Sequence, residues 1–178
     1  MCTPVLSAYT NGCNSTSGVE SIYMIDKKAR ETAAVAISVT AGAGTISGTG
    51  GTAYLWQPLQ TGNFSFTQPI TQDQASGTTS VLQTLTGKLD GYSAALVYLS
   101  GELRKGRFEA VIKMRSGVYI YAGLDFAGLQ VAGGDGGRTG AGANDPNGIE
   151  INLTCESKSE APTIDFQEFN AAFNIETA

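Results

Sequence analysis

One run of helical periodicity stands alone in a sequence whose other segments alternate or carry turn dipeptides. Seven apolar side chains recur at alternating intervals of three and four residues: Leu82, Leu85, Leu89, Tyr92, Leu96, Leu99 and Leu103. This spacing keeps one apolar stripe on the same side of a helix through several turns. The pattern therefore predicts an α-helix over about residues 80–105, laid against a β-sheet body.

The two ends of this predicted helix carry suitable boundary residues. Ser80 can cap the N-terminus, and Gly106 follows the basic last turn as a stop signal. Three interior glycines each cost about 1 kcal/mol relative to alanine, at positions Gly87, Gly91 and Gly101. A helix broken in the middle, with Asp90 as a second N-cap, is therefore the alternative to a continuous one.

The segments before this helix have the composition of strands and turns. Strands are predicted over residues 19–26, 33–39, 54–56 and 63–71. The first two are expected to pair as a hairpin around the charged residues 27–31, which form a solvated turn. The glycine-rich residues 40–52 predict a flexible connection, and Pro69 marks an edge position in the fourth strand.

The segments after the helix alternate more clearly. Residues 107–115 place every second side chain on one face, and the Ser116-Gly117 step predicts a hairpin into residues 118–123. Residues 149–156 alternate as a half-buried strand. The chain is therefore expected to be mainly β, of the α+β type: a β-sandwich or barrel with one helix packed against it. One domain over residues 1–178 is predicted, with arms at 1–18 and 163–178.

Charge and composition exclude several functions. The net charge is −5 and the sequence pI is about 4.6, so a basic surface for nucleic-acid binding is not expected. No apolar run is long enough for a membrane span, and no signal-peptide pattern is present at the start. The chain has three widely spaced cysteines and no CxxC pair: Cys2, Cys13 and Cys155. This pattern indicates buried thiols.

No catalytic or cofactor site emerges from the residues. The chain has no histidine, which removes Ser-His and Cys-His nucleophile pairs and imidazole metal ligands. The glycines of 42–51 lack the lysine of a phosphate-binding loop. Asp135 and Asp145 lack the ligand spacing of a calcium loop. A pair of catalytic carboxylates would come from Glu102, Glu109, Asp125 or Glu150, for which solvated faces are the preferred interpretation. No cofactor, metal or enzymatic activity is assigned.

Aromatic residues leave a binding function open. A sugar platform would draw on Tyr9, Tyr54, Trp56, Tyr119 and Tyr121. Strand alternation makes several of these ordinary sheet residues. These aromatic residues therefore leave recognition of a carbohydrate or a receptor by a β-sandwich as a candidate function.

The order of motifs resembles a known group of proteins. The Leu-patterned segment, the hairpin RFEAVIKMR-SG-VYIYAGLDFAG, a glycine-rich loop and DPNGIEINLTCESKSEAP follow one another as in virion structural proteins of tailed phages that infect Bacteroidota. The similarity covers residues 80–162 and is most recognisable over 145–160. It implies a β-sandwich or barrel, flanked by a helix and assembled with cyclic symmetry into a tail tube or a head-to-tail connector ring. No catalytic residue is implied. The alternative function, based on the aromatic residues, is a carbohydrate- or receptor-binding β-sandwich of a phage tail or a cell surface.

The expected function is therefore that of a structural virion subunit, made in the host cytoplasm and located in the tail or neck. Copies are expected to form a six- or twelve-fold ring that touches neighbouring virion proteins, with no membrane contact. DNA would pass through it without specific binding. The candidate intersubunit contacts are Gly48, Gly50, Asp135, Arg138, Asp145, Asn147, Phe166, Phe169 and Phe173.

Overall fold

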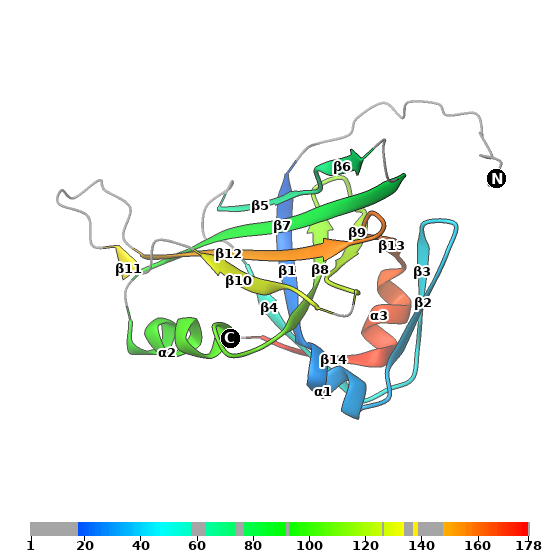
Figure 1. Ribbon diagram of the computed structural model, residues 1–178. Helices are drawn as coiled ribbons and strands as arrows, with labels where there is room; N and C mark the ends of the chain where they lie inside the picture. Colours follow the sequence, from blue (N-terminus) through cyan, green and yellow to red (C-terminus); the bar gives the residue numbers. More distant parts are fainter. Residues whose placement is uncertain are drawn as a thin grey trace.

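Two open β-sheets form most of the molecule (Figure 1). The computed structural model describes residues 18–57, 63–73, 77–91, 93–125, 127–133, 137–138 and 148–177. The eight-stranded sheet has the order β14 (Phe173–Glu176), β4 (Gly51–Trp56), β1 (Val19–Asp26), β8 (Phe108–Met114), β9 (Tyr119–Ala122), β13 (Thr163–Ile164), β3 (Ala43–Ser47) and β2 (Ala36–Thr40). The six-stranded sheet has the order β10 (Gln130–Gly133), β12 (Gly148–Ser157), β7 (Thr78–Asp90) and β5 (Phe64–Thr67), with β11 (Gly137–Arg138) paired to β12 and β6 (Ile70–Asp73) to β7. The chain is thus mostly β, in a sandwich-like arrangement that is not closed.

The eight-stranded sheet is buried on both faces at its centre. Ile22 and Met24 of β1 pack into a core between the two sheets, whereas Tyr23 and Ile25 point to the opposite face. There α3 (Phe166–Ala172) covers a second core. A strand with two buried faces needs apolar residues at successive positions, which explains the continuous apolar run of β1.

The predicted helix over 80–105 is wrong in its first half. Residues 78–90 form β7, and only α2 (Ala94–Leu103) is helical, with Ser93 rather than Asp90 as its N-cap. Val81, Gln83 and Leu85 are buried while Leu82 is exposed, so the side chains alternate with a period of two. The leucine spacing fitted a helix, but ten successive residues of β7 pair with β12. This long-range backbone pairing explains why residues 78–90 form a strand rather than a helix.

The predicted hairpin of residues 19–26 with 33–39 is also wrong. β1 pairs with β4 and β8, and β2 pairs with β3. The charged residues between β1 and β2 form α1 (Lys27–Thr32), which Asp26 caps by accepting a hydrogen bond from Ala29 N. The expected flexible connection of residues 40–52 contains β3 and the start of β4.

The two strongest strand patterns are confirmed. β8 and β9 form the predicted hairpin, and Gly117 supplies a left-handed turn conformation at φ 84°. Ala110 and Ile112 lie in the core between the sheets. In β12, the predicted inward set of Ile149, Ile151, Leu153 and Cys155 is buried. Ile70, just after Pro69, is 56% exposed in β6, the outer partner of β7, as expected for an edge.

The C-terminal segment packs on its own chain. α3 lies against β3, and β14 pairs in parallel with β4. Phe169 and Phe173 are buried, with ring centroids 5.0 Å apart. In this fold both phenylalanines are core residues, because the sheet face they cover is apolar.

Candidate functional site

A groove of about 370 Å³ opens where α2 meets the edge of the eight-stranded sheet. Its aromatic wall is formed by Tyr54 and Trp56, which share one face of β4 because they are two residues apart. Leu99 of α2 forms the opposite wall, and Asp26 and Glu102 also line the groove. The site is therefore mainly apolar, with two carboxylates among its lining residues. We call it the α2 groove.

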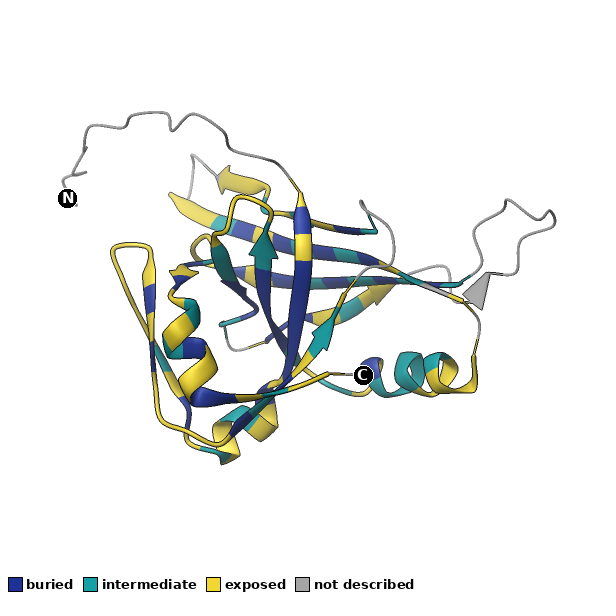
Figure 2. Ribbon diagram, turned by 180° about the vertical axis from the view of Figure 1, so that it is seen from behind, coloured by how far each residue is buried: buried dark blue, intermediate teal, exposed yellow. Residues whose placement is uncertain are grey.

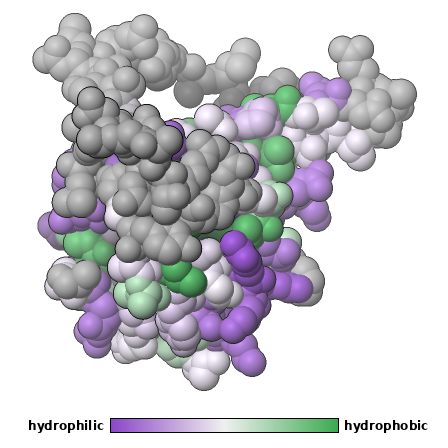
Figure 3. All heavy atoms as spheres, turned by 90° about the vertical axis from the view of Figure 1, so that its left-hand side faces the viewer, coloured by the Kyte–Doolittle hydropathy of each residue, from purple (hydrophilic) through white to green (hydrophobic). Residues whose placement is uncertain are grey.

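The helix beside this groove is apolar on its outer side as well. Leu103 is buried against the core between the sheets, but Val97 is 46% and Tyr98 71% exposed. Ala94 and Ala95 are exposed too. A helix that is apolar all round is normally buried, so this one lacks a partner on its outer face. Figure 3 views the side on which α2 lies and shows hydrophobic residues at the surface among hydrophilic ones.

The eight-stranded sheet ends at β2 in an exposed strand. β2 has the sequence AISVT, without charge or proline, and Val39 is 45% exposed. The β2–β3 hairpin stands on one flank of the molecule and α2 on the other, as both ribbon views show (Figures 1 and 2). Figure 2 shows that most of this hairpin is exposed and that α2 is exposed mainly in its N-terminal half. An uncharged strand edge and a largely apolar helix surface thus lie on opposite flanks.

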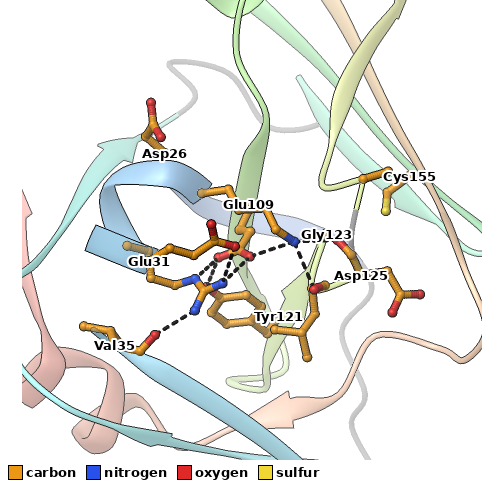
Figure 4. A network of polar contacts seen from close by, with 12 residues as sticks. Asp26, Glu31, Val35, Glu109, Tyr121, Gly123, Asp125 and Cys155 are labelled. Atoms are coloured by element: carbon orange, nitrogen blue, oxygen red, sulfur yellow. Dashed lines mark hydrogen bonds and ion pairs between the residues drawn. The ribbon is translucent and has the colours of Figure 1, made fainter. Parts of the chain in front are cut away.

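A network of buried charges lies below α1 (Figure 4). Glu109 of β8 is fully buried and receives two hydrogen bonds from Arg30, from Nε to Oε2 at 2.6 Å and from Nη2 to Oε1 at 3.1 Å. Tyr121 donates its hydroxyl to Oε2 at 2.7 Å, and Lys27 Nζ lies 3.4 Å from Oε1. Arg30 also donates to Val35 O at 2.6 Å. These contacts fasten α1 to the sheet.

Burial and charge perturb two groups of this network. Burial raises the pKa of Tyr121 well above its usual value, and the neighbouring Glu109 carboxylate raises it further. For Arg30, burial acts to lower the pKa, but the hydrogen bond and charge of Glu109 outweigh it and the pKa rises. Both shifts favour the protonated forms of Tyr121 and Arg30, which donate the hydrogen bonds to Glu109. Because Glu109 has no exposed surface, its role is to hold the structure rather than to meet a substrate.

The described members of the predicted contact set belong to several elements. Gly48 and Gly50 lie ahead of β4 with φ of 99° and 90°, and a Cβ on Gly48 would lie 2.8 Å from Ala34 O. Phe166 stacks on Tyr119 with ring centroids 4.7 Å apart. Arg138 belongs to β11. Asp135, Asp145 and Asn147 lie outside the described residues.

The predicted aromatic residues are divided between different places. Tyr54 and Trp56 share the α2 groove, whereas Tyr121 is buried beside Glu109 and Tyr9 lies outside the described residues. Glu102 is hydrogen-bonded to Lys105. Within the described ranges, no three His, Cys, Asp or Glu side chains are grouped as metal ligands would be.

Sequence reasoning missed Val39, Val97 and Tyr98 as exposed apolar residues. The sequence did carry a signal for these exposed apolar residues, because residues 32–72 and 91–101 contain no Asp, Glu, Lys or Arg.

Comparisons with protein-family models, with curated proteins and with solved structures found no match. No described helix has the length and hydropathy needed to cross a membrane.

Proposed function

We propose that this chain is a structural virion subunit of a tailed phage that assembles with copies of itself into a ring or tube. The observation that carries the proposal is the uncharged, exposed strand β2 at one end of an open eight-stranded sheet. The sequence resemblance described above supplies the class of virion protein.

An exposed sheet edge is normally protected. Proteins place lysine, proline or bulges on edge strands, because unpaired backbone groups bind other strands. β2 carries no charged residue and no proline, and its β-branched Ile37 and Val39 favour strand pairing. An edge of this kind is suited to a partner, and a cyclic assembly of identical subunits gives every such edge one.

The charge of the chain agrees with a conduit for DNA. A net charge of −5 disfavours binding to the phosphate backbone, so DNA would move past such a surface without being held. A six- or twelve-fold ring in the tail or the head-to-tail connector, in contact with other virion proteins, is the assembly we propose.

The test is the assembly state of the purified chain. Light scattering after size exclusion and negative-stain images are expected to show closed rings or tubes. Val39→Lys places a charge next to the β2 edge and is expected to reduce assembly. Val118→Lys is the matched control, since Val118 is 43% exposed in the turn between β8 and β9, and β9 is three strands from β2 in the sheet order. A wild-type chain that stays monomeric at high concentration contradicts the proposal.

One observation favours a second function, recognition of a carbohydrate. Tyr54 and Trp56 stand side by side in the α2 groove with Asp26, Glu102 and Thr52 nearby. Aromatic faces together with carboxylates and a hydroxyl can hold a sugar ring, and the groove volume falls within the usual range for small ligands. A glycan array tests this function, with Trp56→Ala expected to abolish any signal. Monomeric protein with a glycan signal would replace the structural proposal.

A further inference from the structure

We infer that the α2 groove, together with the outer face of α2, receives the β2–β3 hairpin of the next copy of this chain. This inference rests on the proposed function and names the surfaces that join the subunits. Tyr54, Trp56, Val97 and Tyr98 form the receiving surface. Ile37 and Val39 lie on the hairpin that enters it.

The placement of the two surfaces suits a ring. A head-to-tail ring needs two different patches on each subunit, so that every copy both gives and receives a contact. The hairpin and α2 occupy opposite flanks of the molecule in both ribbon views (Figures 1 and 2). Identical patches on a two-fold axis would instead close the assembly at a dimer.

Charge singles out the same two surfaces. Each copy carries a net charge of −5, so contact between two copies is opposed wherever acidic residues meet. The hairpin and β4 lie within residues 32–72, and most of α2 lies within 91–101, two stretches without any charged residue. The α2 groove also holds the Asp26 and Glu102 carboxylates, but the hairpin brings no acidic residue to them, so the contact joins no like charges.

Cross-linking between engineered cysteines tests the contact in the full chain. In a background with Cys2→Ser and Cys13→Ser, the double variant Val39→Cys/Tyr98→Cys is treated with a short bismaleimide. Cys155 remains, because it is buried. The expected result is a ladder of covalent oligomers that ends at the size of the ring. Val118→Cys/Tyr98→Cys, with a valine of similar exposure, is expected to give no ladder.

The outcomes separate this inference from the proposed function. Rings that form but cross-link only in the control, or in neither variant, overturn the inference and leave ring assembly standing. A wild-type chain that forms no oligomer overturns both. A second measurement is Tyr98→Glu, which is expected to raise the concentration needed for assembly at least about tenfold while the circular dichroism spectrum stays unchanged. Unaltered assembly of this variant also overturns the inference.

Discussion

Tyr121 donates its hydroxyl hydrogen to Glu109 Oε2 at 2.7 Å, and neither side chain has any exposed surface. The two residues belong to neighbouring strands, and Arg30 approaches the same carboxylate from α1. A buried carboxylate is tolerated only where charge and hydrogen bonds compensate it. The pair therefore marks the point at which α1 is fixed to the sheet.

Replacing Glu109 by glutamine is expected to lower the free energy of unfolding by about 3–5 kcal/mol, because Lys27 would lose its ion-pair partner and Arg30 would keep only its pair with the more exposed Glu31. Urea denaturation measures the loss. Glu20→Gln is the control, since its ion pair with Lys113 is more exposed and is expected to contribute less than about 1 kcal/mol. Equal losses in both variants would contradict a structural role for the buried network.

Tyr121 makes stability depend on pH at the alkaline end. Its pKa in the folded chain is raised, so the folded state keeps a proton that the unfolded chain releases above pH about 10. The stabilisation is therefore complete below pH 10 and is lost as pH rises further. Tyr121→Phe should remove this component, so its difference from wild type in unfolding free energy stays constant below pH about 10 and shrinks above it by up to about 1.4 kcal/mol per pH unit. A difference that stays constant above that pH as well contradicts the shift.

Two glycines within the predicted helix are expected to respond to alanine with opposite signs. A Cβ on Gly87 of β7 would lie 2.5 Å from Phe64 Cε1, so Gly87→Ala should cost about 1–3 kcal/mol. Gly101 lies in α2 with open space around its Cβ position, so Gly101→Ala should stabilise by up to about 1 kcal/mol. Thermal unfolding of both variants measures this. Stabilisation by both would instead support one continuous helix.

Phe169 is expected to be essential for the fold of the monomer. Its ring is fully buried and lies 5.3 Å from that of Tyr23 and 5.0 Å from that of Phe173. Phe169→Ala should cost about 3–5 kcal/mol, measured by urea denaturation. Gln167→Ala on the same helix is the control, with little expected change. A folded monomer of unchanged stability after Phe169→Ala would restore the view of this segment as a free arm.

The thiol of Cys155 is expected to be unreactive in the native chain. Burial raises its pKa, and the nearby Asp125 carboxylate acts in the same direction, so little thiolate is present at neutral pH. With Cys2 and Cys13 replaced by serine, a thiol reagent at pH 7.5 should label the protein only after urea is added. Rapid labelling of the folded chain would show that β12 opens readily.

Patterns confined to neighbouring residues identified much of the β structure. The alternating side chains of β8 and β12 reflect the two faces of a single strand. The glycine of the turn before β9 reflects the local backbone geometry of that turn. The segment from Leu82 to Leu103 was ambiguous, because its leucines fit a helix throughout but its first half also alternates. Of the aromatic residues, Tyr54 and Trp56 were recognised as candidates, but their groove depends on α2 arriving from another part of the chain.

The amino-acid sequence alone determined the mainly β character, the hairpin of β8 with β9, the alternation of β12 and the uncharged stretches, because these depend on residues close together in the chain. Only the tertiary structure decided that residues 78–90 are a strand, that Phe169 is a core residue, and that Glu109 meets Arg30. The physical reason is that backbone pairing and burial join segments far apart in sequence, and the free energy of those contacts outweighs local preference.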